Sequence, residues 1–222
     1  MNIIYEDNHV IVVVKPKGVP SQQDKTKDKD MLTLVKEYIK EKYNKPGEVY
    51  LGLVHRLDRM TEGLMVFGRT SKGASRLSEC IRDGNFKKEY LAVVKGKIEE
   101  DGILENYLLK NEKTNISKVV NKETKGAKQA KLEYTVLGYT KYNNEDYTYV
   151  KIKLYTGRHH QIRVQFSNIK HPLYGDIKYG GVKGDLALVA YKLSFIHPTK
   201  DEICEFKYFP QKTGIWRDFN WT

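Results

Sequence analysis

The densest group of chemically active side chains in the sequence is His55-Arg56-Leu57-Asp58-Arg59, a charged stretch between two apolar segments. Asp58 has an arginine close on each side, and nearby positive charge favours the ionised form of a carboxyl group. An ionised carboxylate suits a nucleophile or a charge stabiliser better than a general acid. The same pattern is also typical of an ion-pair loop that joins two elements, so the cluster alone leaves both interpretations open.

A second cluster carries basic, imidazole and amide groups. It comprises Thr156-Gly157-Arg158-His159-His160-Gln161-Ile162-Arg163, followed by His171-Pro172 and Gly175-Asp176. Seven Lys or Arg residues and one acid, Asp176, lie between Lys151 and Lys183, so much of the positive charge is concentrated here. Adjacent histidines cannot easily face one ion, and no cysteine or glutamate is at ligand spacing. We therefore expect no metal site, and we expect the histidines to cap or pair locally.

A third feature is Phe86-Lys87-Lys88-Glu89-Tyr90, which leads into an apolar strand. A tyrosine at the start of a strand commonly packs half-buried in a core. It can also present its ring to an extruded base, because stacking on an aromatic ring holds a nucleotide without reading its sequence.

Composition limits the function classes. The 222 residues include 39 Lys and Arg against 28 Asp and Glu, a formal charge of +11, with 40% hydrophobic residues. That hydrophobic content excludes a disordered chain, and the charge favours a polyanionic partner or a merely basic, soluble protein. Cys80 and Cys204 are far apart, which predicts no disulfide framework and a reducing cytoplasm. No apolar run approaches the roughly 20 residues of a membrane span, and the N-terminus lacks the pattern of a signal peptide.

Hydrophobic periodicity then predicts the elements that carry these clusters. We expect strands within residues 3–14, with Val10–Val14 buried on both faces, and further strands at 64–67, 90–94, 131–137, 147–154, 186–194 and 202–206. We expect helices at 32–43 and 71–83, the second capped by Ser71, and a surface hairpin or loop over Lys110–Lys131. The sequence thus predicts one α+β domain over residues 1–222, built on an extended, mostly antiparallel sheet flanked by helices and loops.

Taken together, the clusters resemble the RluA-type pseudouridine synthases. The matching residues are Tyr5-Glu6-Asp7-Asn8-His9 with Lys15-Pro16 and Gly18; His55-Arg56-Leu57-Asp58-Arg59 with Thr61 and Gly63; Lys88 and Tyr90; Thr156-Gly157-Arg158 with His160-Gln161-Ile162-Arg163-Val164; and His171-Pro172 with Gly175-Asp176 and Tyr179-Gly180. The match runs in order along nearly the whole chain. It departs from the family at Met60-Thr61-Glu62-Gly63 and at Gln165, where the family commonly has Asp-Thr-Ser-Gly and a histidine.

The resemblance implies that the protein isomerises uridine to pseudouridine in ribosomal or transfer RNA, without a cofactor. It implies that Asp58 is the catalytic carboxylate, acting on ribose C1′ either as nucleophile or by promoting a glycal. Tyr90 would stack on the uracil, Arg163 would pair with Asp58, and Arg56 would fill the space left by the extruded base. The same motifs place RNA-binding residues at His55, Arg56, Arg59, Lys88, Arg158, His160 and Gln161.

The resemblance also implies a pseudouridine-synthase-like fold with an active-site cleft across its middle, and a monomer. Many relatives begin with an S4 RNA-binding domain, whereas here the catalytic motifs start within the first ten residues, so we expect no such domain. Substrate positioning would then fall to Lys110–Lys131 and to the loop Ser21–Asp30. Two rival interpretations remain. One is a catalytically silent RNA-binding or ribosome-assembly protein of the same fold, and the other is a hydrolase that uses Asp58 with His55.

Overall fold

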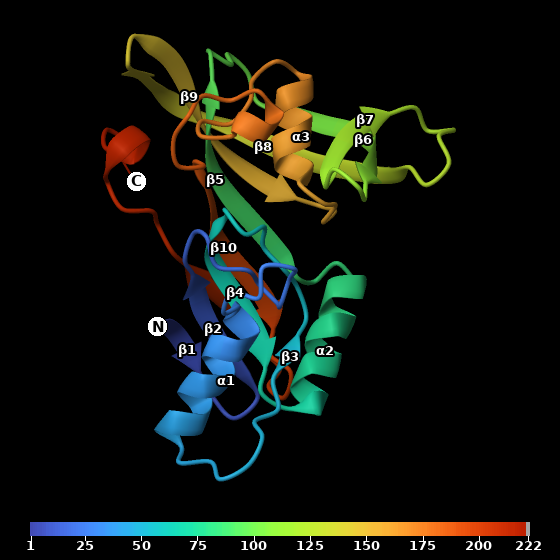
Figure 1. The fold of residues 1–222 in the computed structure, drawn as a ribbon, viewed down its shortest axis with the longest axis vertical. Helices are drawn as coiled ribbons and strands as arrows, with labels where there is room; N and C mark the ends of the chain where they lie inside the picture. Colours follow the sequence, from blue (N-terminus) through green and yellow to red (C-terminus); the bar gives the residue numbers. More distant parts are fainter. Residues whose placement is uncertain (221–222) are drawn as a thin grey trace. The chain divides into compact units, whose positions relative to one another are not determined.

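A computed structural model describes residues 1–220, which form two compact units (Figure 1). The first unit contains residues 1–87 and 190–208, and the second contains residues 88–189 and the segment that begins at residue 209. Each unit contains several paired strands and at least one helix that packs on them.

In the first unit the strands pair in the order β1-β2-β4-β10-β11, and the short β3 pairs with β4. Its strands and helices are β1 (Asn2–Glu6), β2 (Val10–Lys15), α1 (Met31–Lys42), β3 (Gly52–Leu53), β4 (Glu62–Gly68), α2 (Ser71–Arg82), β10 (Leu188–Ile196) and β11 (Ile203–Lys207). Strands β2 and β4 are antiparallel, with Lys15 opposite Gly63. This register puts the end of β2 beside the start of β4, next to Asp58.

The core of the first unit lies on both faces of β2, as its continuous apolar run predicts. Val10, Val12 and Val14 pack in one cluster with Leu77 of α2 and Phe195 of β10. The alternate residues of β2 are equally buried and point to the other face, which α1 covers (Figure 1). The expected burial of this strand on both sides is therefore confirmed.

Side-chain caps set the start of both helices in this unit. Asp30 caps α1, because its carboxylate accepts a hydrogen bond from the amide of Thr33. Thr70 caps α2 in the same way through the amide of Gly73, at 3.0 Å. The expectation that Ser71 caps α2 was wrong by one residue, because Ser71 is already the first helical residue.

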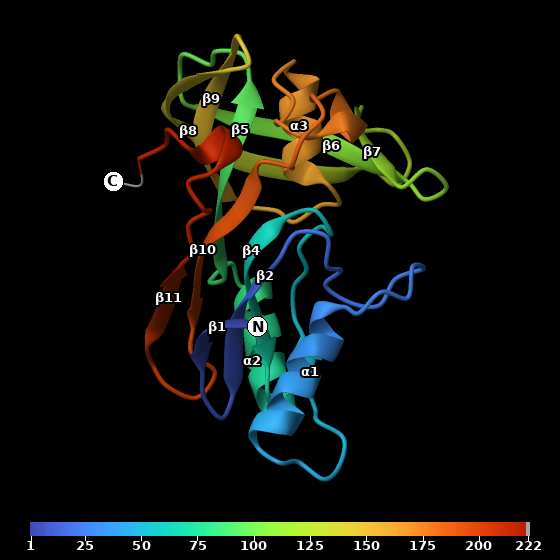
Figure 2. The same cartoon turned by 60° about the vertical axis from the view of Figure 1, so that its left-hand side comes forward.

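In the second unit strongly twisted antiparallel strands pair in the order β5-β9-β8-β6-β7 (Figure 2). Its elements are β5 (Lys87–Lys95), β6 (Gly102–Asn111), β7 (Ile116–Val120), β8 (Lys128–Tyr142), β9 (Glu145–Leu154), α3 (Gln161–Asn168) and the 3₁₀ turns η1 (Ile177–Tyr179) and η2 (Gly214–Trp216). Helix α3 packs on these strands. Val164 contacts Leu108 and Ala130, and the ring of Phe166 meets that of Tyr134 edge-on at 5.3 Å.

Two predicted turns of the second unit form as expected. The hairpin between β8 and β9 turns at Asn143 and Asn144, both with positive φ, the conformation that a tight two-residue hairpin requires. The Lys-rich stretch 110–131 forms the β6–β7 hairpin and the start of β8, as the surface-hairpin interpretation predicted.

The predicted fold class is confirmed, since long antiparallel strands dominate and helices cover them. That residues 1–222 act as one catalytic domain stays a prediction; residues 221 and 222 lie outside the described part of the chain. None of the helices in residues 1–220 is long and apolar enough to cross a membrane.

Candidate active site

Asp58 lies in an irregular segment between β3 and β4 that several buried hydrogen bonds hold in place. His55 anchors its start, because Nε2 accepts a hydrogen bond from the amide of Val66 at 3.0 Å and the ring meets Phe86 edge-on at 5.1 Å. His55 is buried, so its side chain faces the core of the first unit. The sequence predicts that His55 binds RNA, and this stays a prediction; in the structure its ring is buried and accepts a hydrogen bond within the first unit.

The main chain on both sides of Asp58 is also tied to the residues that follow β2. The hydroxyl of Ser21 accepts a hydrogen bond from Leu57 N at 3.0 Å and donates one to Leu57 O at 2.8 Å. The carbonyl of Arg59 accepts from Gly18 N at 3.0 Å and from Lys15 Nζ at 2.8 Å. Asp58 therefore lies between two main-chain anchors, which limits the movement of its Cα atom.

Lys15 is a charged residue that sequence reasoning noted in a motif without assigning it a role. Its side chain is completely buried, and Nζ donates to the carbonyls of Pro16, Val19 and Arg59. Burial lowers the pKa of Lys15 to about 8, while the negative charges of Asp58 and Glu62 act in the opposite direction. The signal in the sequence is a lysine at the end of a strand that is otherwise wholly apolar.

The two arginines of the Asp58 cluster have different environments. Arg56 is exposed, whereas Arg59 binds the loop 21–30 through Thr26 Oγ1 at 3.0 Å and through the carboxylates of Asp24 and Asp28. The loop expected to position substrate is thus connected to the residue after Asp58 by an exposed ion-pair cluster. Exposed pairs of this kind are weak and are screened by salt, so Arg59 can exchange them for other anions.

In the second unit, Tyr90 lies on β5 opposite Ile152 of β9 and is buried. Lys88 lies two residues earlier on the same face of β5 and is half-buried, and burial lowers the pKa of its ammonium group. The alternation of a strand therefore places the expected aromatic and the expected lysine on one face.

Gln161 organises the turn that precedes α3. Its Oε1 accepts from the hydroxyl of Thr156 at 2.8 Å and from Arg158 N at 3.0 Å, and its Nε2 donates to Lys131 O at 3.2 Å. His160, just before the helix, has a φ of 53°, in the left-handed region. Gln161 and His160 are buried, whereas Arg158 is exposed with Nε held by Gln129 O at 2.7 Å. Of these three expected RNA-binding residues, Arg158 alone is at the surface.

Arg163 forms a buried bidentate ion pair with Asp176. Nε donates to Oδ2 and Nη2 donates to Oδ1, both at 2.7 Å, and the guanidinium lies 5.0 Å from the ring centre of Tyr179. Sequence reasoning paired Arg163 with Asp58 and did not predict this partner. The signal was present, because Asp176 is the one acid in the basic stretch around Arg163.

A network of neutral side chains surrounds that ion pair. Tyr179 Oη accepts from Ser117 N at 2.9 Å and lies 2.8 Å from His160 Nδ1, while Ser117 Oγ lies 2.8 Å from His159 Nδ1. Burial and the positive charges of Arg163 and nearby lysines lower the pKa of His160 to about 2 and that of His159 to about 4. The expectation of local pairing is confirmed, with the two imidazoles stacked at 3.7 Å. Within residues 1–220, no three His, Cys, Asp or Glu residues are grouped so that they could hold a metal ion.

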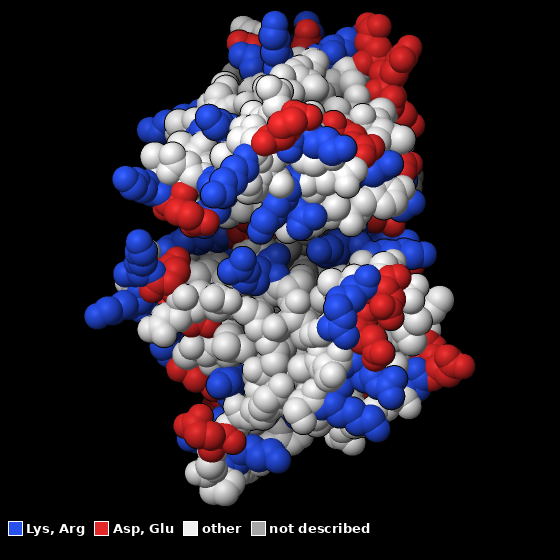
Figure 3. Space-filling model, turned by 90° about the vertical axis from the view of Figure 1, so that its right-hand side faces the viewer, with Lys and Arg blue, Asp and Glu red and all other residues white. Residues whose placement is uncertain are grey.

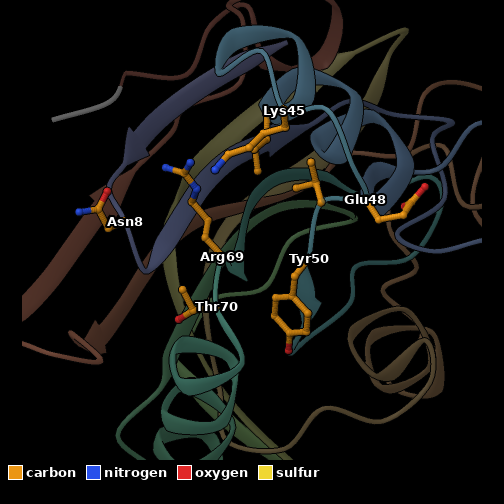
Figure 4. Close-up of a pocket in the computed structure, with 8 residues that line it drawn as sticks. Asn8, Lys45, Glu48, Tyr50, Arg69 and Thr70 are labelled. Carbon is orange, nitrogen blue, oxygen red and sulfur yellow. The ribbon is translucent and has the colours of Figure 1, made fainter.

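A cavity of about 270 Å³ in the first unit lies at the other end of β4 from Asp58. Arg69 and Lys45 point into it from different segments, beside Thr70, while the carboxylate of Glu48 points away (Figure 4). Arg69 is held by Glu6 at 3.1 Å and lies over the ring of Tyr43. Because β4 separates this cavity from Asp58, it is not the site at which that carboxylate acts.

The predicted residues are divided between the two units. His55, Arg56, Asp58 and Arg59 belong to the first, and Lys88, Tyr90, Arg158, His160, Gln161 and Arg163 belong to the second. Within the first unit the structure brings Asp58 and Arg59 together with Lys15 and Ser21. Within the second it brings Arg163 together with His160, Tyr179 and Asp176.

Comparison with known proteins identifies the family. A model of RNA pseudouridylate synthases matches residues 9–168. The chain is 31% identical to a ribosomal large subunit pseudouridine synthase D of Vibrio cholerae, over 93% of this chain and 66% of that protein. It is 30% identical to a tRNA pseudouridine synthase C of Vibrio parahaemolyticus, over 91% and 87%. The solved structure of human RNA pseudouridylate synthase domain containing 1 superposes with a TM-score of 0.76 at 25% identity, covering 94% of this chain and 83% of that one. The resemblance to RluA-type enzymes is confirmed, and this chain belongs to the RNA pseudouridylate synthase family, whose members are isomerases that act on uridine in RNA.

Proposed function

We propose that Asp58 is the carboxylate that acts on ribose C1′ of the target uridine. In this isomerisation the N1–C1′ bond breaks, the uracil turns, and C5 bonds to C1′; the proton of C5 leaves and N1 gains one, so no cofactor is needed. The observation that carries the assignment is the fixed main chain at Asp58 together with the buried ammonium of Lys15, whose charge interacts with that carboxylate. A nearby cation favours the ionised form, the form in which a carboxylate can attack carbon or stabilise positive charge.

Tyr90 and Arg163 complete the proposed catalytic set. Tyr90 stacks on the uracil and serves in proton transfer, and Arg163 supplies positive charge that keeps Asp58 ionised. Two observations support the choice of Arg163. Its guanidinium is oriented by Asp176 through two hydrogen bonds, and the imidazoles beside it are neutral, so they do not compete as cations.

We assign contact with the RNA to exposed basic groups. Lysine and arginine side chains are spread over the face drawn in Figure 3, with acidic side chains between them. Arg56 and Arg158 are exposed, and Lys88 and Arg59 are partly so, whereas His55, His160 and Gln161 support them from inside. We expect the enzyme to act as a cytoplasmic monomer on ribosomal or transfer RNA, the two substrates for which its relatives are named.

The test is release of tritium from RNA that carries 5-tritiated uridine, comparing wild type, Asp58→Asn and Asp83→Asn. Asp83 is an exposed aspartate at the end of α2 and serves as the matched control. We expect wild type and Asp83→Asn to release tritium and Asp58→Asn to release none. Full release by Asp58→Asn would refute the assignment of Asp58, and no release by wild type from any RNA class would favour a silent RNA-binding protein. Free uracil among the products would indicate a hydrolase.

A further inference from the structure

Ser21, the residue that begins the loop 21–30, makes two hydrogen bonds with the main chain beside Asp58. Its hydroxyl oxygen accepts from Leu57 N at 3.0 Å and donates to Leu57 O at 2.8 Å, and Met65 Sδ lies 3.6 Å away. Ser21 is 5% exposed, so water does not compete for these bonds. One hydroxyl thus satisfies both main-chain groups of Leu57, as a neighbouring strand would.

These contacts constrain Asp58 through the peptide bond. The carbonyl of Leu57 and the amide of Asp58 belong to one planar unit, so fixing that carbonyl also fixes the direction in which the chain enters Asp58. On the other side, Thr61 N donates to Asp58 O at 3.0 Å and Arg59 O accepts from Lys15 and Gly18. Because both peptide planes beside Asp58 are held in place, the carboxylate can move mainly by rotation about the side-chain bonds of Asp58.

We propose that Ser21 is a positioning residue for Asp58: its hydroxyl fixes the Leu57–Asp58 peptide plane and so holds the carboxylate where the ribose presents C1′. The inference rests on the proposed role of Asp58. It adds a residue outside the charged cluster, 37 positions away from Asp58 in the sequence, to the reaction machinery. Misplacement of a reacting group by about 1 Å can cost on the order of 100-fold in rate, so loss of this hydroxyl has a kinetic consequence separate from stability.

The second unit supplies a matched control. Thr148 is completely buried, and its hydroxyl likewise donates to a carbonyl, Gly96 O at 2.8 Å, and accepts from an amide, Ile98 N at 3.0 Å. Ser21→Ala and Thr148→Val therefore remove the same kind of double contact. The first adjoins Asp58 and the second lies outside the proposed machinery.

The experiment measures the single-turnover rate at saturating RNA, the RNA dissociation constant in an Asp58→Asn background, and the melting temperature. For Ser21→Ala we expect a fall of about 10- to 100-fold in the single-turnover rate with an unchanged dissociation constant. For Thr148→Val we expect a lowered melting temperature and a wild-type rate. Should Ser21→Ala fail to fold, Ser21→Cys, which keeps the volume but weakens the hydrogen bonds, is used for the same comparison.

Two results would overturn the proposal. One is a Ser21 variant that turns over at the wild-type rate, and the other is an equal loss of rate in the Ser21 and Thr148 variants, which would mean a purely structural role. Failure of the proposed function is recognised separately, because there Asp58→Asn itself is as active as wild type or the wild type is inactive.

Discussion

Arg163 and Asp176 form a two-point ion pair whose acid is wholly buried: Nε and Nη2 of the arginine bind the two carboxylate oxygens at 2.7 Å each. A guanidinium bound at two points has its plane as well as its position fixed. Asp176 lies beyond α3, at the start of η1, so the pair also ties that segment to the helix. The orientation of Arg163 is thus set within the second unit.

Breaking this pair should destabilise the protein strongly. Asp176→Ala removes the carboxylate that accepts two hydrogen bonds from the buried guanidinium, and loss of one member of a buried pair costs about 3–5 kcal/mol. Urea denaturation followed by circular dichroism measures the change. Asp28→Ala, which removes an exposed partner of Arg59, serves as the control and should leave the unfolding midpoint unchanged. Equal midpoints for the two variants would contradict the buried-pair interpretation.

His160 should make stability depend on pH. Its pKa in the folded protein, about 2, is below the ordinary value of 6.5, so between these values the unfolded chain binds the proton and the folded chain does not. Stability from this group is therefore complete above pH 6.5 and decreases as pH falls, by about 2 kcal/mol between pH 7 and pH 5.

The measurement is the free energy of unfolding of wild type and His160→Gln at several pH values. A plot of the free energy of unfolding against pH should be flatter for the variant than for wild type between pH 5 and 6.5. The difference in slope should correspond to up to one proton bound on unfolding, whatever the absolute stability of the variant. Equal slopes for the two proteins would show that His160 binds its proton as readily in the folded protein as in the unfolded chain, which would contradict the prediction.

Gly63 should tolerate no side chain. Its φ is +126°, and a Cβ atom would lie 2.3 Å from the carbonyl oxygen of Ala190 on β10, a main-chain atom that cannot easily move. Backbone strain and overpacking together predict a loss of at least about 3 kcal/mol for Gly63→Ala. Gly84→Ala, with φ +74° and open space around the new Cβ, should lose only about 1–2 kcal/mol. Thermal unfolding of the pair tests this, and a smaller loss at Gly63 would contradict the close approach of β4 and β10.

Lysines of the stretch 110–131 should bind phosphate groups of the RNA. Lys118, Lys122, Lys125 and Lys128 are exposed, and within residues 1–220 none has an ion pair. Changing all four to Gln should weaken RNA binding and reduce the slope of log K against log salt by about 0.7–0.9 for each phosphate that is no longer neutralised. A control variant removes four positive charges elsewhere, by changing Lys36, Lys40, Lys45 and Lys72 of the first unit to Gln. It tests whether that loss of charge has an equal effect on RNA affinity and on the salt slope. An unchanged slope in the first variant would exclude these lysines from the interface.

Much of the fold followed from local patterns. The apolar run of β2, the helical spacing of α1 and the Asn143-Asn144 turn were predicted correctly, because each depends on neighbouring residues and on burial alone. The cap of α2 was misplaced by one residue, because both Thr70 and Ser71 can cap and only the path of the chain decides between them.

By itself the sequence determined the fold class, the family resemblance and the residue types from which catalysis is proposed, since order and chemistry along the chain suffice for these. Tertiary structure decided which side chains contact one another. The Arg163–Asp176 pair, the buried Lys15 and the Ser21–Leu57 contacts join residues 13, 44 and 36 positions apart. No local pattern encodes such contacts, because burial and hydrogen-bond geometry arise only when distant segments pack together.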